Sequence, residues 1–87
     1  MNQFECDSNK SASNLEKHGI DFFTAQVLWH DPDLIEIQTK SDVEPRFLLV
    51  GRIRDKYWSA IVAYRNNKIR IISVRRARMS EVKLYES

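Results

Sequence analysis

Three β-rich runs joined by very short connections occupy the second half of the sequence. They cover residues 47–53, 57–64 and 69–75, and about three residues separate each run from the next. Connections this short fit hairpins, so the runs predict an antiparallel meander. Residues 34–39 alternate apolar and polar side chains, which predicts a further, half-exposed strand. A polar turn is expected between them, at residues 40–45.

Capping residues predict a helix near the start of the chain. Asp7 or Ser8 can accept hydrogen bonds from the first free N–H groups of this helix. The helix is expected to run to about His18, because Gly19 supplies the left-handed residue that commonly ends a helix.

Two more helices complete the predicted fold. Asp21 caps a helix at residues 22–30, whose apolar side chains surround most of its circumference, so we expect it to be largely buried. Ser80 caps a last, short helix at residues 81–85. The predicted class is therefore α+β, with two N-terminal helices, a four-stranded antiparallel sheet and a short C-terminal helix.

Length and cysteine content narrow the class of protein. We expect residues 1–87 to form a single domain, because so short a chain buries too little surface for two cores. Cys6 is the single cysteine, which excludes an internal disulfide and fits a reducing compartment. The first residues lack the basic start and apolar run of a signal peptide, and no apolar stretch is long enough to span a membrane. We therefore expect a cytoplasmic protein without membrane contact.

A metal or other cofactor is not expected. His30 beside Asp31 and Asp33 is the cluster that most resembles a set of metal ligands. Carboxylates directly after a helix end are more often part of a turn.

Charge is distributed very unevenly along the chain. Residues 1–44 hold three basic and nine acidic residues, a balance of −6, whereas residues 45–87 hold eleven basic and three acidic ones, a balance of +8. Such an excess can make one surface attractive to phosphate, so polyanions are candidate partners. The alternative is that the arginines only keep strand edges and helix faces hydrated and bind no polyanion.

Strand geometry sorts the arginines of the last β-rich run. Side chains two residues apart share a face, so Arg70 and Arg76 are expected on one face, and Ser73 and Arg75 on the other. A guanidinium group donates two parallel hydrogen bonds to a phosphate and stays charged at any relevant pH. The ends of this run can therefore hold a backbone phosphate.

Few residues suit the acid and base roles that metal-free RNA cleavage requires. His18 is a histidine, the residue type most often used as a general acid or base, and Glu81 follows a basic run that keeps it ionised. Simpler roles stay open for both. His18 beside Gly19 can be a helix cap, and Glu81 in a first helical turn can complement the helix dipole. Tyr85 can stack on a base, although core packing is the commoner role of tyrosine.

Two separated motifs match a known family in their order and spacing. The first comprises Phe4-Glu5-Cys6-Asp7, Lys10, Asn14, Lys17-His18-Gly19-Ile20 and Phe22. The second comprises Ile69-Arg70-Ile71-Ile72-Ser73, Arg75-Arg76-Ala77, Glu81 and Tyr85. With these motifs the sequence resembles the BrnT toxins. Cys6 departs from the family pattern, which often has tryptophan there, and so puts an aromatic role at that position in doubt.

The resemblance implies a RelE-like fold and a metal-independent endoribonuclease that inhibits translation. It also implies a BrnA-like antitoxin with a ribbon-helix-helix DNA-binding part, a heterotetramer with that antitoxin, and contact with operator DNA only through it. By this resemblance the catalytic set is Lys17, His18, Arg52, Arg70, Ser73, Arg76 and Glu81. Together with the basic strand positions, it makes RNA-binding candidates of Arg46, Arg75, Arg78 and Tyr85.

Two other functions fit the same basic surface. A binding module for RNA or DNA without catalysis needs only phosphate contacts. A structural subunit would only present its sheet to another chain. Catalysis differs from both because it requires a titratable group within reach of a bound phosphate, and a binding module predicts strong salt dependence.

Overall fold

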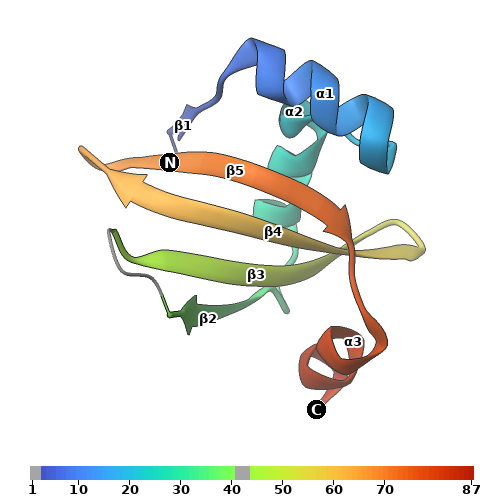
Figure 1. The fold of residues 1–87 in the computed structure, drawn as a ribbon. Helices are drawn as coiled ribbons and strands as arrows, with labels where there is room; N and C mark the ends of the chain where they lie inside the picture. Colours follow the sequence, from blue (N-terminus) through green and yellow to red (C-terminus); the bar gives the residue numbers. More distant parts are fainter. Residues whose placement is uncertain (1–2, 41–43) are drawn as a thin grey trace.

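The computed structural model describes residues 3–40 and 44–87. Its elements in chain order are β1 (Phe4–Glu5), α1 (Ser8–His18), α2 (Phe22–Ala25), the 3-10 helix η1 (Gln26–His30), β2 (Ile35–Thr39), β3 (Arg46–Ile53), β4 (Lys56–Arg65), β5 (Lys68–Arg76) and α3 (Met79–Glu86). The strands form one sheet in the order β1-β5-β4-β3-β2 (Figure 1). The protein is therefore α+β, as the sequence predicts.

The predicted four-stranded antiparallel sheet is wrong in one respect, because β1 adds a fifth strand. Strands β2 to β5 form the expected antiparallel meander. Strand β1 pairs in parallel with β5, with Phe4 opposite Ile69 and Glu5 opposite Arg70. Two residues are too few to show a period-two pattern, and their pairing depends on a strand more than sixty positions away.

The turn predicted at residues 40–45 falls partly on residues 41–43, outside the described residues.

The first helix has the predicted bounds and caps. The carboxylate of Asp7 accepts hydrogen bonds from the N–H groups of Asn9 (2.9 Å) and Lys10 (3.2 Å). Gly19 ends α1 in the left-handed conformation, with φ at 79°, and its N–H donates to the carbonyl of Leu15. Residues with a Cβ rarely adopt this conformation, which is why glycine stands there.

The second helix differs from its prediction in form and in burial. Asp21 caps α2 as expected, but α2 gives way after Ala25 to the 3-10 helix η1. Only one side of this segment is buried, and Phe23 and Val27 are 77% and 46% exposed. One sheet face can bury only one side of a helix, so apolar residues all around it do not all become core.

The last helix begins earlier than predicted. Its N-cap is Arg78 and its first residue is Met79, so Ser80 lies within the helix. The side chain of Glu81 accepts a hydrogen bond from the N–H of Arg78 at 2.8 Å and thereby stabilises this earlier start.

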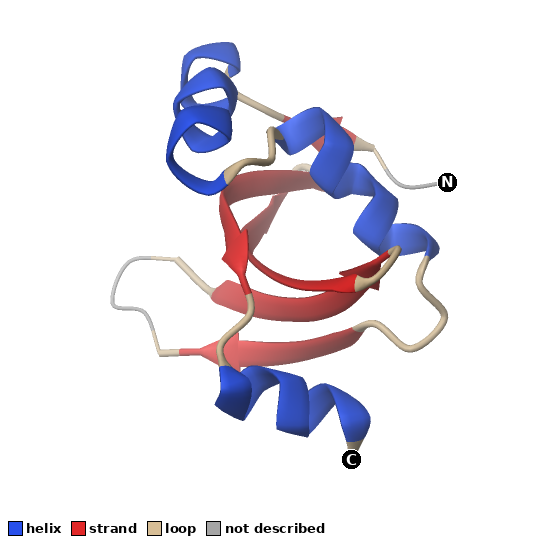
Figure 2. Cartoon of the chain, turned by 90° about the vertical axis from the view of Figure 1, so that its right-hand side faces the viewer, coloured by secondary structure: helices blue, strands red, loops and turns tan. Residues whose placement is uncertain are grey.

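Helices lie on both sides of the sheet (Figure 2). One side is covered by α1, α2 and η1, which pack into the main core through Ile20, Phe22, Ala25 and Leu28. Helix α3 lies on the other side, and the hydroxyl of Ser59 on β4 donates to Glu81 on α3 at 2.8 Å. The main core thus occupies one face of the sheet, and the opposite face is covered only by α3 among the elements described.

Candidate functional site

A β-bulge in β5 decides which residues of this strand share a face. Arg70 pairs with Ala63 and Ser73 with Ile61, so three steps along β5 match two along β4. Ile72 is the extra residue. Residues directly opposite each other in an antiparallel pair point to the same side of the sheet. Arg70 and Ser73 therefore share a face, although strict alternation would place them on opposite faces.

The predicted grouping of the β5 arginines is wrong for this reason. Arg70, Ser73 and Arg75 lie together on the face opposite α1 and α2. Arg76 lies on the helix-covered side, where its guanidinium is 5.5 Å from the ring centroid of Trp58. The extra residue of a bulge reverses the alternation beyond it, and a single sequence gives no periodic indication of where it lies.

Three rows of side chains cross the sheet on the face opposite α1 and α2. The first row is Ile35, Val50, Ser59 and Arg75. The second row is Ile37, Leu48, Ile61 and Ser73. The third row is Thr39, Arg46, Ala63 and Arg70. Helix α3 covers the first row, and we call the second and third rows, with the bulged Ile72, the open face.

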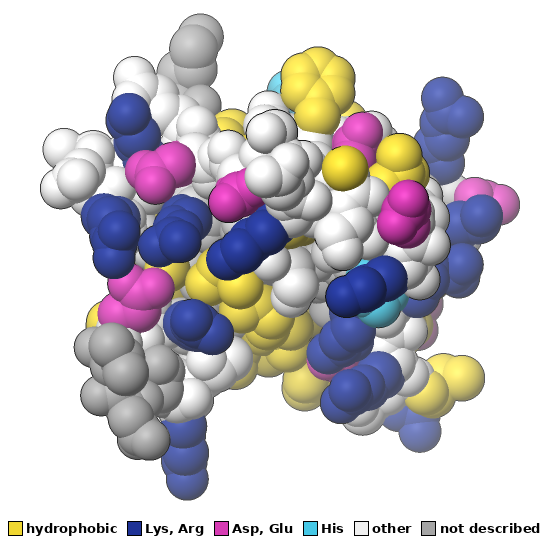
Figure 3. Space-filling view, turned by 45° about the horizontal axis from the view of Figure 1, so that its top comes forward, with side chains coloured by type: hydrophobic (Ala, Val, Ile, Leu, Met, Phe, Trp, Pro, Cys, Tyr) yellow, Lys and Arg dark blue, Asp and Glu magenta, His cyan; other side chains and the backbone are white. Residues whose placement is uncertain are grey.

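The open face combines an apolar centre with positive charge. Ile37 is 37% exposed, Leu48 and Ile61 are half-buried, and Arg46 is exposed. Figure 3 shows hydrophobic side chains at the centre of the molecule in this view, with several Lys and Arg side chains beside them. The positive half-chain seen in the sequence is thus partly gathered around one sheet surface.

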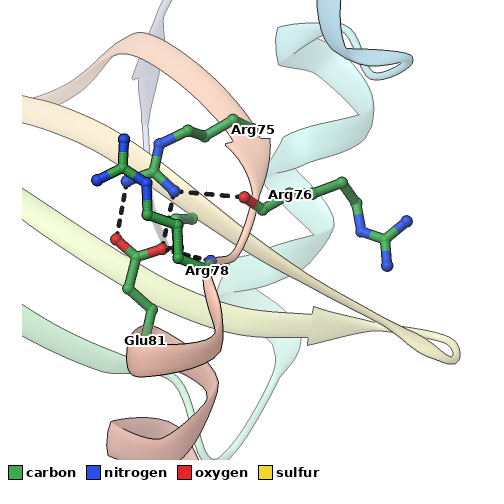
Figure 4. A network of polar contacts seen from close by, with 5 residues as sticks. Arg75, Arg76, Arg78 and Glu81 are labelled. Atoms are coloured by element: carbon green, nitrogen blue, oxygen red, sulfur yellow. Dashed lines mark hydrogen bonds and ion pairs between the residues drawn. The ribbon is translucent and has the colours of Figure 1, made fainter.

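Glu81 fixes Arg75 at the border of the open face (Figure 4). The carboxylate accepts hydrogen bonds from both terminal nitrogens of Arg75, at 2.8 and 2.7 Å. It also accepts hydrogen bonds from the Ser59 hydroxyl and from the Arg78 N–H. These hydrogen bonds, with that from Arg75 as the largest cause, lower the pKa of Glu81 to about 2. The same contact raises the pKa of Arg75. A carboxylate this acidic is a poor acceptor for a proton during catalysis.

Arg52 and Tyr85 meet near Asp31, next to α3. Asp31 accepts hydrogen bonds from the Arg52 N–H at 2.8 Å and from the Tyr85 hydroxyl at 2.7 Å. Burial, followed by the hydrogen bond to Asp31, raises the pKa of Tyr85 to about 12. The Arg52 guanidinium lies 5.7 Å from the ring centroid of Tyr57. The exposed guanidinium of Arg52 is thus held at the edge of the sheet.

Asn14 joins the end of α1 to the end of β5. Its buried amide donates to the carbonyls of Ile20 (2.8 Å) and Val74 (2.9 Å), and its oxygen accepts from the N–H of Val74 (3.1 Å). Helix α1 and β5 run side by side in the same direction (Figure 1). His18 follows Asn14 by one helical turn on the same side, and Arg76 follows Val74 by two strand positions. Both steps run in the same direction along the pair, so His18 and Arg76 stand at the same end of α1 and β5.

A wide groove opens at this end of the sheet, between η1 and the turn that joins β3 to β4. Its volume is about 940 Å³, and its lining includes Gly19, which directly follows His18. Arg54 and Lys56 contribute positive charge to it, and Asp33 contributes a carboxylate. The groove provides space for a ligand next to the end of α1.

A protein-family model provides the comparison that decides the class of this chain. The model is described as the ribonuclease toxin BrnT of a type II toxin-antitoxin system, and it matches residues 6–81. The chain belongs to the BrnT family. This confirms the resemblance inferred from the two motifs, and membership implies an antitoxin partner and an RNA substrate. A search of the curated proteins finds no match to this chain.

The predicted site residues of this BrnT toxin fall into two groups. On the open face or along its border with α3 lie Arg46, Arg52, Arg70, Ser73, Arg75, Arg78, Glu81 and Tyr85. At the ends of α1 and β5 lie Lys17, His18 and Arg76. Sequence reasoning assigned no role to Asn14 or Ser59. The presence of Asn14 in the first motif was the one available indication of its importance.

Two further observations concern metals and membranes. Within residues 3–40 and 44–87, no three side chains of His, Cys, Asp or Glu are grouped so that they can hold a metal ion. None of the helices in the described part of the chain is both long and apolar enough to cross a membrane.

Proposed function

We propose that this chain is a metal-independent endoribonuclease with a RelE-like fold, which cleaves RNA and thereby inhibits translation. A BrnA-like antitoxin with a ribbon-helix-helix part neutralises it in a heterotetramer, and operator DNA is contacted only through that antitoxin. Family membership supports the toxin class and the RNA substrate. The observation that supports the catalytic proposal is the Asn14 junction, which ties α1 to β5 one helical turn before His18 and two strand positions before Arg76.

In this mechanism His18 moves the proton and cations stabilise the charge. The imidazole takes the proton of an RNA 2′-hydroxyl while the 2′-oxygen bonds to the adjacent phosphorus and the bond from phosphorus to the 5′-oxygen breaks. The leaving 5′-oxygen takes a proton from solvent water, which gives a 2′,3′-cyclic phosphate and a free 5′-hydroxyl, and the imidazolium of His18 returns its proton to the hydroxide left behind. Arg76 and Lys17 neutralise the phosphate and the extra negative charge that develops on it.

The arginines of the open face and of its border with α3 guide the RNA to this site. From Arg70 to Arg76, β5 advances about 20 Å, which is enough for a single strand to place several phosphates along it. The RNA contacts of this path come from Arg46, Arg52, Arg70, Ser73, Arg75, Arg78 and Tyr85. The groove beside the β3–β4 turn accepts the part of the RNA beyond the cleaved bond.

Glu81 has a positioning role in this proposal. Its carboxylate has a pKa of about 2 and already accepts four hydrogen bonds. It therefore orients Arg75 toward the RNA path, and the proton transfer falls to His18.

The test compares the two histidines of the chain. His18→Gln should reduce RNA cleavage by about 10² to 10⁴ fold, because glutamine keeps the size and hydrogen bonding but transfers no proton. RNA affinity should stay within about twofold, since the phosphate contacts remain. His30→Gln is the comparison variant: His30 is also exposed and ends a helix, and because it lines the groove its loss should change RNA affinity rather than the rate of proton transfer.

Cleavage of a labelled RNA by the purified proteins, with affinity and melting measured in parallel, decides the result. Turnover near the wild-type level in His18→Gln would refute the catalytic role of His18. A wild-type protein that binds RNA in a salt-dependent way but never cuts it would instead identify a binding module.

A further inference from the structure

We infer that the antitoxin docks a segment with apolar and acidic side chains on the open face, with the second row as its anchor. This inference rests on the proposed function for its partner and for the RNA contacts that the docking would cover. It adds which surface is bound and which chemistry the bound segment has.

The second row is an apolar surface without a role in the main core. Ile37, Leu48 and Ile61 lie side by side on β2, β3 and β4, and the bulged Ile72 extends the row onto β5. None of the four belongs to the buried core cluster or packs against it. Neighbouring aliphatic side chains left partly in water mark a surface that gains free energy when another chain covers it.

Positive charge flanks this apolar row on the side away from α3. Arg46 and Arg70 lie in the third row, and Lys68, the first residue of β5, is exposed. Glu5 on β1 lies beside Arg70, and the three cations leave this rim with a net positive charge. Arginine forks pair with carboxylates in a bidentate geometry. Protein interfaces usually have an apolar centre and a polar or charged rim. Because this rim is positively charged, it is complementary to an acidic partner.

The aliphatic row favours a protein over RNA as the ligand of the second row. RNA offers phosphates, which need cations, and bases, which gain most by stacking on aromatic or guanidinium planes. Ile37, Leu48 and Ile61 supply neither, whereas apolar side chains of a partner can pack against them. Arg46 and Arg70, by contrast, serve phosphate and carboxylate equally well. The antitoxin therefore packs against the apolar centre of the open face, whereas RNA binds its arginines.

This division makes neutralisation separable from cleavage. Ile61→Thr keeps a β-branched side chain in the strand but removes the apolar anchor. We expect the Kd for the purified antitoxin of this pair to rise by at least about tenfold, as for loss of a central interface contact. Cleavage of RNA without antitoxin should stay within about twofold. Ile37→Thr, in the edge strand β2, should also raise the antitoxin Kd. It keeps the test decisive if Ile61→Thr misfolds.

Phe23→Ser is the matched control, because Phe23 is 77% exposed on α2, on the other side of the sheet. It should leave the antitoxin Kd unchanged. Calorimetric titration with antitoxin, RNA cleavage and melting are measured for each variant.

The outcomes separate this inference from the proposed function. Unchanged antitoxin affinity in both Ile61→Thr and Ile37→Thr, with intact melting transitions, would overturn it, and so would a loss confined to Phe23→Ser. Weaker RNA binding with unchanged antitoxin affinity would assign the second row to RNA instead. If the wild-type protein cuts no RNA, the proposed function fails, but the antitoxin titrations still decide where the antitoxin docks.

Discussion

Replacing Glu81 with glutamine should destabilise the protein strongly at neutral pH and hardly at all in strong acid. Glu81 is 7% exposed and links α3 to β4 and β5 through its contacts with Ser59 and Arg75. Glutamine presents an NH2 group where one carboxylate oxygen now accepts hydrogen bonds. Two donors then face each other, and the guanidinium of Arg75 loses its counter-charge.

The size of the effect follows from the pKa. A carboxyl group whose pKa falls from 4.5 to about 2 on folding stabilises the folded state by about 3 kcal/mol at neutral pH. The Arg75 side chain is 28% exposed, and water screening reduces this to about 2 to 3 kcal/mol. For a domain of this length that corresponds to a fall of about 10 to 20 °C in Tm.

The pH dependence has a definite sign. The folded-state pKa of Glu81 is depressed, so its contribution is fully present above pH 4.5 and is lost as the pH falls toward 2. The difference in the free energy of unfolding between wild type and Glu81→Gln should therefore shrink through this window.

Urea denaturation from pH 7 to pH 2 measures this difference. Glu16→Gln is the control, since Glu16 is exposed on α1 and its loss changes the net charge equally. A difference for Glu81→Gln that stayed constant from pH 7 to pH 2, or that matched the control at pH 7, would refute the reasoning.

Two further substitutions test how the fold holds the site. Asn14→Leu leaves three buried main-chain groups without their partner and should cost about 2 to 4 kcal/mol; a Tm close to that of the wild type would contradict this. Gly51→Ala adds a Cβ 2.8 Å from Leu34 Cδ1 and 2.9 Å from Leu28 Cδ2, and calorimetry should show a loss of about 1 kcal/mol because the leucines can shift only slightly. A gain in stability would show that the space is larger than the contacts indicate.

Local chemistry allowed most of the elements to be predicted. The cap at Asp7 and the left-handed Gly19 fixed both ends of α1, since each acts within one helical turn. Short connections likewise predicted the antiparallel pairing of β2 to β5, because a connection of a few residues requires the next strand to lie beside the previous one. The start of α3 was missed because Glu81, three residues inside the helix, stabilises Arg78 as the N-cap.

The features that arrange the site depend on residues far apart in the sequence. Strand β1 forms only because β5 offers a free edge, and the bulge at Ile72 is visible only from the register with β4. That one residue moved Arg70 to the face of Ser73 and separated it from Arg76. The sequence supplies candidates for the catalytic and binding residues, but their division between two surfaces could not be predicted from it.

The Asn14 junction also bears on assembly and aggregation. An edge strand with free N–H and C=O groups can recruit a strand from another molecule. On β5, β1 occupies the edge at Ile69 and Arg70, and the Asn14 side chain occupies the main-chain groups of Val74 in place of a neighbouring strand. At the other edge β2 pairs with β3 alone. A foreign strand that extends this sheet should therefore pair more readily with β2 than with β5.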